Sequence, residues 1–334
     1  MRFGVSLLAL AQQPSGTDPI RQVEEILTWA RAARDLGFDY LTMGQHYLTA
    51  PYQMLQPIPL LARLIPETGQ MRLISTLVIP LHNPVDLAET LSTLDVLSRG
   101  RIGISCALGY RDEEFLAFGV DPKRRVSRMM ECLQCLVRLW TEGEVTFHGQ
   151  HFSLERATVV LRPVQKPHPP LWIAANSDRA IVRAARMGFP WNINPHATMS
   201  TIQRQVALYR QAALEAGHDP NIPLPMGREL YCAPNLERAW EEAGPYLYGK
   251  YQAYAQWGQD KALPGQENFR TRPEELAQDR FVVGSPDDCA RVLERYASLG
   301  IGYAHFRMHW PGMPLEQALR GMELFATRVM PRFR

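Results

Sequence analysis

Stretches rich in apolar and β-branched residues alternate with longer segments of helical period along almost the whole chain. Residues 2–8 are predicted to form a buried strand. The apolar positions in 19–36 recur at the 3.6-residue spacing of a helix, which is predicted to end at Gly37. Residues 38–43 follow at once as the next strand. This alternation is typical of repeated βα units.

Eight strands are predicted in this way, at 2–8, 38–43, 71–79, 101–106, 170–174, 189–193, 224–232 and 303–308. Helical patterns lie at 19–36, 55–64, 84–97, 126–140, 178–187, 200–216, 236–254, 286–299 and 314–329. Such strict alternation predicts an α/β fold, a (β/α)8 TIM barrel, as a single domain over 1–334. An open doubly wound sheet is the alternative, but residues 8–12 lack the glycines of a dinucleotide-binding turn.

Two segments interrupt the alternation. Residues 143–154 alternate on either side of 148–150, which predicts an inserted hairpin after the fourth helix. Residues 256–280 are polar, contain Pro and Gly and show no periodicity, so they are predicted to be a long loop before the last βα unit. In a barrel, an insertion of this kind often closes over the site as a lid.

The first sixteen residues allow two interpretations. Arg2 and the apolar run after it resemble a short secretory leader that ends at Ala9-Leu10-Ala11. Such a leader would be shorter than the roughly 15 to 30 residues that are usual, and its removal would take away one of the eight strands. We therefore expect 2–8 to be the first barrel strand and 11–18 to be the first loop over the site.

Composition narrows the function classes. The 36 Lys and Arg residues nearly balance the 34 Asp and Glu residues and form no dense tract, so nucleic acid is not an expected partner. No apolar run approaches the roughly 20 residues that span a bilayer, so no membrane segment is expected. Five scattered cysteines are not a disulfide framework, which favours a reducing, cytoplasmic location.

In a barrel, the residues directly after each strand form the site. Here these segments are mostly apolar and aromatic, and their few ionisable residues are His46, Arg111, Arg307 and His309. A hydrolase or a metal centre would be expected to show paired acids or a His/Asp cluster there, so no metal is expected. This composition favours an organic cofactor that carries out the chemistry.

Several residues have both a functional and a structural interpretation. His46 is a candidate acid or base, or a packing histidine. Residues 176–177 suit a phosphate, although a plain helix cap is the commoner role of such residues. Arg125 and Arg128 suit a phosphate too, although pairs of this spacing more often lie on a solvated helix face. Cys106 is a candidate to line a cofactor site, or else a thiol packed in the core.

Three stretches resemble the superfamily of flavin-dependent monooxygenases typified by bacterial luciferase. GFDYLTMGQHY at 37–47 is similar to that family's second strand and the turn after it. LDVLSRGR at 94–101 is similar to the approach to its fourth strand, and LRPVQKPHPPLWIA at 161–174 to the approach to its fifth. These and shorter matches occur in order along nearly the whole chain.

The resemblance implies a barrel that binds reduced FMN, or in some branches the deazaflavin F420, at the carboxyl ends of its strands. In the monooxygenase branch, an NAD(P)H:flavin reductase supplies reduced FMN, and oxygen adds to it as a flavin hydroperoxide that oxidises a small apolar organic molecule. An apolar site protects such a species from water. The implied partners are the reductase, the small-molecule substrate and a second copy of the chain, in a homodimer or higher homo-oligomer.

The resemblance also assigns roles to single residues. His46 would give or take a proton at the reactive edge of the flavin ring. The ring would be bordered by Ser6 and by Thr76, which is expected near a strained or cis peptide, and flanked by Asn83, Cys106 and Tyr110. The phosphate would be held by Arg125, Asn176 and Ser177, and the loop 256–280 would close over the substrate.

The chain departs from the family pattern at four positions. Gln45 stands where an acid is common, Tyr47 where a second histidine is common, and Ser105 and Ala107 where glycines are usual. The change at Gln45 removes the usual carboxylate neighbour of His46. This change keeps open a flavin-binding or structural homologue without turnover. An F420-dependent oxidoreductase that transfers hydride without oxygen is a second alternative to an FMN monooxygenase, because both kinds of enzyme use the same barrel.

Overall fold

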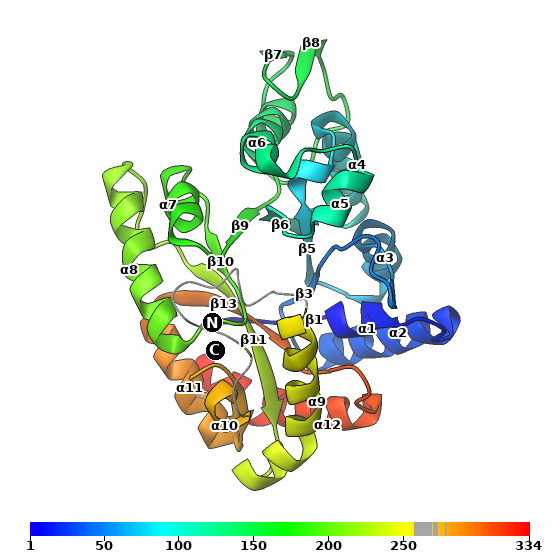
Figure 1. The fold of residues 1–334 in the computed structure, drawn as a ribbon, viewed down its shortest axis with the longest axis vertical. Helices are drawn as coiled ribbons and strands as arrows, with labels where there is room; N and C mark the ends of the chain where they lie inside the picture. The colour runs from blue at the N-terminus through cyan, green and yellow to red at the C-terminus, as the bar shows by residue number, and fades with distance from the viewer. Residues whose placement is uncertain (257–268, 270–272, 278) are drawn as a thin grey trace.

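The eight predicted strands form a closed parallel barrel in a computed structural model, which describes residues 1–256, 269, 273–277 and 279–334 (Figure 1). The strands pair in the order β1-β3-β5-β6-β9-β10-β11-β13, and β13 pairs with β1 to close the ring. Their bounds are β1 (Arg2–Ser6), β3 (Tyr40–Met43), β5 (Arg72–Val78), β6 (Ile102–Ala107), β9 (Leu171–Ala175), β10 (Trp191–Ile193), β11 (Leu224–Cys232) and β13 (Ile301–Arg307). The predicted fold class is confirmed.

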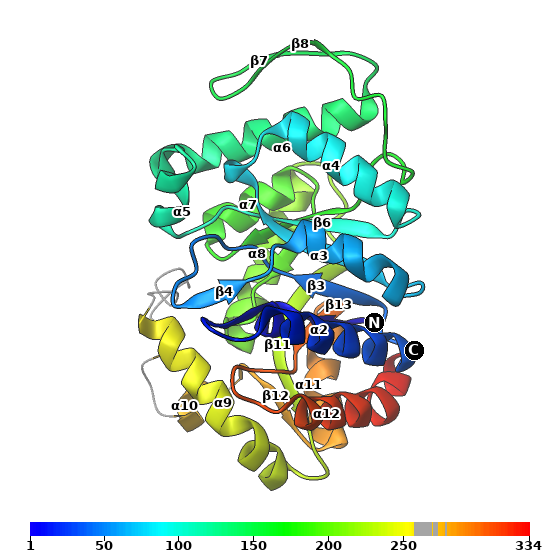
Figure 2. The same ribbon diagram turned by 90° about the vertical axis from the view of Figure 1, so that its right-hand side faces the viewer.

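Helices return the chain along the outside of the barrel, and Figure 2 shows α12, α2, α3, α4 and α6 following one another around one side. Asp18, Asn83 and Ser285 each accept a hydrogen bond from a backbone N–H of the first helical turn, as side-chain caps do. The main helices are α2 (Pro19–Asp35), α3 (Pro57–Leu64), α4 (Pro84–Leu97), α6 (Arg125–Thr141), α7 (Asp178–Arg186), α8 (Met199–Glu215), α9 (Leu236–Gln256), α11 (Pro286–Ser298) and α12 (Leu315–Arg328).

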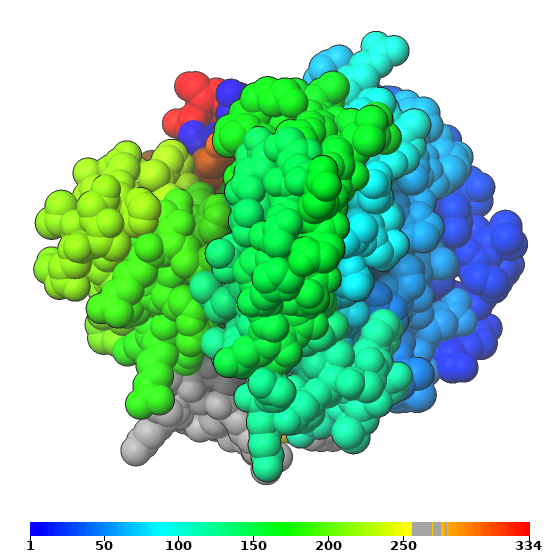
Figure 3. All heavy atoms as spheres, turned by 90° about the horizontal axis from the view of Figure 1, so that it is seen from above, coloured from blue at the N-terminus to red at the C-terminus, as the bar shows by residue number. Residues whose placement is uncertain are grey.

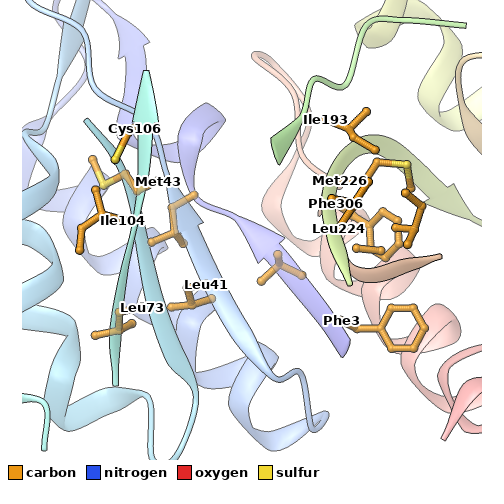
Figure 4. Close-up of a cluster of buried hydrophobic side chains, with 14 of the residues drawn as sticks. Phe3, Leu41, Met43, Leu73, Ile104, Cys106, Ile193, Leu224, Met226 and Phe306 are labelled. Atoms are coloured by element: carbon orange, nitrogen blue, oxygen red, sulfur yellow. The ribbon is translucent and has the colours of Figure 1, made fainter. Parts of the chain in front are cut away.

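Alternation along each strand divides the core into two layers. The outer layer lies between the strands and the helices and includes Phe3, Leu41 and Ile104, all fully buried and drawn in Figure 4. The inner layer fills the barrel. There the ring of Tyr40 makes edge contacts with Trp172 and with the aromatic side chains of β13. The barrel interior is therefore packed at this level.

The predicted hairpin is present as β7 (Val145–His148) and β8 (Ser153–Ala157), an antiparallel pair. It packs on α6, because the Glu131 carboxylate accepts the backbone N–H groups of Gln150 and His151, and the Arg128 guanidinium lies 4.4 Å from the centre of the Phe152 ring. Figure 3 shows α6 and the hairpin segment as one raised ridge beside α7 and α8.

Short elements that the sequence did not predict lie around the barrel ends. The expected first loop at 11–18 instead contains the end of α1 (Leu8–Ala11) and β2 (Gln12–Pro14), which pairs with β4 (Tyr52–Met54). Strands of three residues are too short to show alternation, which is why this pair was missed. The other additions are α5 (Asp112–Ala117), α10 (Pro273–Ala277) and β12 (Val282–Gly284). Most of the expected lid, 256–280, lies outside the described residues.

None of the helices described is long and apolar enough to cross a bilayer.

We predict that Gly4→Ala destabilises the barrel, because a Cβ at Gly4 would lie 2.5 Å from the ring of Tyr40, which is held by neighbouring aromatic rings. Overpacking of this kind costs about 1–3 kcal/mol of unfolding free energy. Gly143→Ala is the matched control, since no atom lies within 4 Å of its Cβ position. Urea denaturation measures both variants, and equal midpoints would contradict the prediction.

Candidate active site

A cavity of about 620 Å³ opens at the carboxyl end of the barrel. Its walls come from the segments that follow β1, β3 and β6, from the last residue of β13 and from α9. This is the end at which barrel enzymes carry their sites, and the volume lies in the range of small-molecule sites. The lining residues are Leu8, Gln12, His46, Thr49, Ala50, Tyr110, Arg111, Asp112, Glu113, Leu116, Tyr254 and Arg307.

His46 is oriented by a carboxylate that lies 68 residues further along the chain. Its Nδ1 is 3.0 Å from Oε1 of Glu114 on α5, and the Glu114 side chain is completely buried. An ionised carboxylate can only accept hydrogen bonds, so Nδ1 carries the proton and donates it. This leaves Nε2 as the ring nitrogen that can exchange a proton with a molecule in the cavity.

Several donors stabilise the charge of Glu114. Burial raises its pKa, but the hydrogen bond from His46, the backbone N–H of Tyr47 at 2.9 Å and the charge of Arg111 outweigh burial and leave the pKa below its ordinary value. Glu114 is therefore ionised at neutral pH. Its second oxygen, Oε2, has no hydrogen-bond partner among the described residues.

Gln45 fixes the turn that carries His46. Its side-chain oxygen accepts the backbone N–H of Val78 at 3.0 Å and lies 3.0 Å from Nε2 of His82, while its amide donates to the hydroxyl of Tyr47. A carboxylate here could not donate to Tyr47 in this way. The amide at Gln45 thus supports the loop, and Glu114 supplies the acid that the sequence lacked at this place.

A second completely buried carboxylate, that of Glu229 on β11, forms ion pairs with two cations. Its Oε1 lies 2.5 Å from the Lys250 ammonium and 3.3 Å from the Arg307 guanidinium, and its Oε2 accepts the indole N–H of Trp310 at 2.7 Å. Burial lowers the pKa of Lys250 to about 7. Arg307 acts in the same direction, and Glu229 opposes them. When Lys250 is protonated, these three groups carry one excess positive charge beside the cavity among the described residues.

Polar side chains also lie inside the barrel. Asn192 of β10 donates from Nδ2 to the hydroxyl of Ser105 on β6 at 2.8 Å. Because β9 lies between these two strands in the barrel, the bond crosses the interior. The Oδ1 of Asn192 is buried and has no partner among the described residues. An acceptor in that position needs a donor from a ligand or from water.

The structure brings only some of the predicted residues to the cavity. His46 and Tyr110 line it, and their rings meet edge to face with their centres 5.6 Å apart. Ser6 and Thr76 face the barrel interior by strand alternation. Thr76 lies in a regular strand, paired with Ser105. The cis peptides found in the described chain are Ala50–Pro51 and Lys166–Pro167, so no cis peptide lies near Thr76.

Cys106 and Asn83 are placed differently from the prediction. Alternation in β6 directs Ser105 into the barrel, so the Cys106 side chain lies in the outer core layer, completely buried (Figure 4). Burial raises the pKa of its thiol, and Cys132 of α6 adds to this effect. Asn83 is an exposed cap that accepts the backbone N–H of Val85. Neither residue is positioned to flank a ring in the cavity.

The predicted phosphate residues lie at the starts of α6 and α7. Arg125 is partly exposed, 3.8 Å from the carboxylate of Asp112. The neighbouring Arg128 donates to the carbonyl of Pro80 and is thereby engaged in the fold. Ser177 occupies the cap position of α7, where its side chain makes no capping hydrogen bond, and the backbone carbonyl of Asn176 accepts the amide of Gln205.

Sequence reasoning missed Glu114, Glu229 and Lys250. The two glutamates were missed because only residues directly after strands were expected to form the site. Glu114 lies inside a short helix, and Glu229 lies in a nine-residue strand that is buried throughout. A charged residue in such an apolar strand was the available signal, since buried acids are nearly always paired. Within the described residues, no three acidic, His or Cys side chains cluster as a metal ion would require.

A closed βα barrel with its polar cavity at the carboxyl end defines a TIM-barrel enzyme. A family model described as luciferase-like monooxygenase matches residues 1–302, so the chain belongs to this family and is an oxidoreductase. The alkanal monooxygenase alpha chain of the Kryptophanaron alfredi symbiont is 24% identical, over 99% of this chain and 98% of its own length. The oxygenase component of the flavin-dependent trigonelline monooxygenase of Acinetobacter baylyi is also 24% identical, over 100% and 96%.

Two solved structures show how widely the fold is shared. The oxygenating constituent of 3,6-diketocamphane monooxygenase from Pseudomonas putida, in complex with FMN, superposes with a TM-score of 0.84 at 17% identity, over 99% of this chain and 98% of its own. An F420-dependent secondary alcohol dehydrogenase, in complex with an F420–acetone adduct, gives a TM-score of 0.79 at 18% identity, over 100% and 99%. Both confirm the barrel fold.

The depressed pKa of Lys250 predicts a pH effect on stability. Between pH 7 and about 10 the unfolded chain keeps a proton that folded Lys250 has lost, so raising the pH favours the folded state. In the Lys250→Met variant this contribution is absent. The difference between the unfolding free energies of the wild type and the variant, measured by urea denaturation from pH 7.5 to 9.5, should shift in favour of the wild type by about 1 kcal/mol per pH unit. A constant difference would contradict this.

Proposed function

We propose that this protein is the oxygenase component of a two-component FMN monooxygenase. It takes reduced FMN from an NAD(P)H:flavin reductase and uses oxygen to oxidise a small, mainly apolar organic molecule. The observation that carries the proposal is His46, held at the cavity wall by the buried Glu114 carboxylate. The monooxygenase relatives in this family support the same assignment.

The residues at the cavity fit a reduced flavin ring. The volume of about 620 Å³ suits a group of that size. A reduced flavin carries hydrogen-bond donors. The Oδ1 of Asn192, which has no partner among the described residues, offers an acceptor for such a donor. Ser6, Thr76 and Tyr110 remain as proposed neighbours of the ring, and Arg125, Asn176 and Ser177 as proposed phosphate ligands.

Bound reduced FMN would supply the electrons that activate oxygen. The protein's own part is orientation and control of one proton. His46 holds its Nδ1 proton against Glu114, so Nε2 is free to take a proton from the reacting molecule or, once protonated, to return it. Leu8, Leu116 and Tyr110 contribute apolar surface to the cavity wall, which suits an apolar substrate.

We predict that the purified protein binds reduced FMN more tightly than F420. Fluorescence and absorbance titrations with FMN, reduced FMN and F420, followed by addition of oxygen, test this. Saturable binding of F420 alone would contradict the proposal and favour hydride transfer, for which the F420-dependent neighbour of the same fold is the precedent. Binding of no cofactor would favour a homologue without turnover. Light scattering tests the homodimer or higher homo-oligomer that we also propose.

A second prediction concerns His46. His46→Gln should reduce coupled substrate oxidation about 100-fold or more, because the imidazole that transfers the proton is lost. Affinity for reduced FMN should change little. His218→Gln is the control, since this exposed histidine lies at the carbonyl of Arg186 and is not among the residues that line the cavity. Product formation per NAD(P)H consumed is the measurement, and an unchanged yield in His46→Gln would remove His46 from the mechanism.

A further inference from the structure

A small side pocket of about 50 Å³ adjoins the main cavity. The two spaces share Leu8, Gln12, Tyr254 and Arg307 in their walls, so they are neighbours across these side chains. The remaining walls of the side pocket are Ala9, Tyr52, Lys250, Ala253 and Pro311. No step of the proposed mechanism uses this space.

The polar groups of the side pocket are mainly hydrogen-bond donors. Lys250 offers an ammonium and Arg307 a guanidinium, and neither can accept a hydrogen bond when charged. Gln12 adds an amide. None of the described lining residues is an acid. A pocket with this donor set is suited to an anion.

Among the described residues, the buried charges at this pocket do not balance when Lys250 is protonated. Lys250 and Arg307 share the single carboxylate of Glu229, at 2.5 and 3.3 Å. Only 7% of the Lys250 side chain and 18% of the Arg307 side chain are exposed, so solvent screens this cluster weakly. The acids that line the main cavity, Asp112 and Glu113, lie near Arg125 and Arg111 instead. A second carboxylate at the pocket would neutralise the excess positive charge.

The size of the pocket decides which anion fits. A volume of about 50 Å³ holds a few water-sized groups, which matches a carboxylate but not an aromatic ring system. A flavin ring fits only the larger cavity. Arg307 borders both spaces, so a ligand whose carboxylate meets Arg307 in the side pocket can extend its apolar part into the main cavity, whose wall contains His46.

We propose that the side pocket binds a carboxylate of the substrate through Arg307 and Lys250, and that the substrates are therefore small organic acids with an apolar body. The statement that the bound molecule is the substrate rests on the proposed function, whereas the binding of a carboxylate does not. Anchoring one end of the molecule fixes which of its atoms lies near His46. Arg307 and Lys250 are thus specificity-determining residues.

The test compares two probes of equal length, octanoate and octanamide, on the protein without flavin. Isothermal titration calorimetry at pH 6.5 keeps Lys250 protonated. Octanoate should bind about 10- to 100-fold more tightly than octanamide, as charge-assisted hydrogen bonds imply. Arg307→Gln should weaken octanoate by a similar factor and leave octanamide within about twofold. Lys250→Met should act in the same direction, and serves if Arg307→Gln does not fold.

Arg72→Gln is the matched control, because Arg72 also lies on a barrel strand but lines a different pocket with Arg2, Asp39 and Tyr303. It should leave both affinities unchanged. Equal affinity of the wild type for the two probes would overturn the inference. So would an Arg307→Gln variant that binds octanoate normally but has lost affinity for reduced FMN, since the cations would then serve the flavin. A clear preference for octanoate in a protein that binds no flavin would support the pocket while refuting the proposed function.

Discussion

The burial of the Glu114 carboxylate constrains the geometry of the candidate site. A buried carboxylate without partners is costly, so the surrounding chain must bring donors to it. The imidazole of His46, the backbone N–H of Tyr47 and the guanidinium of Arg111 all meet the same oxygen. These contacts join the loop after β3 to α5 and hold the imidazole at the cavity wall. Glu114 is a positioning residue, because it acts on the reacting molecule only through His46.

Glu114 and Glu229 have different roles at the candidate site. Glu114 orients His46, which can exchange a proton, whereas Glu229 pairs with two cations. Each carboxylate is fully buried, yet their partners differ: one meets mainly an imidazole and a backbone N–H, the other Lys250 and Arg307. The cavity wall therefore combines a group that can exchange a proton with the guanidinium of Arg307.

The fold followed from the sequence because alternation is a local signal. Every barrel strand was predicted within a few residues of its observed bounds, including β1, whose apolar run also resembled a leader. Alternation could also have corrected the prediction for Cys106. In β6, Ile102, Ile104 and Cys106 share one face and Gly103 and Ser105 the other, so Cys106 belongs to the outer core layer. His46 and Tyr110 were found because they directly follow strands.

The partners of the site could not be found in this way, because they are far apart in the chain. Glu114 reaches His46 across 68 residues, and Lys250 reaches Glu229 from a separate helix. Only the three-dimensional course of the chain brings them together. Gln45 misled the prediction for the same reason: it occupies the expected place of an acid, while the acid itself comes from α5.

The central claim is that Glu114 sets the tautomer of His46, and long-range ¹H–¹⁵N spectroscopy of ¹⁵N-histidine-labelled protein tests it most directly, with His46→Gln used to assign the resonances. The account predicts that neutral His46 carries its proton on Nδ1 in the wild type, and that Glu114→Leu loses this preference. Neutral His46 protonated on Nε2 in the wild type, or an unchanged tautomer in Glu114→Leu, would contradict it.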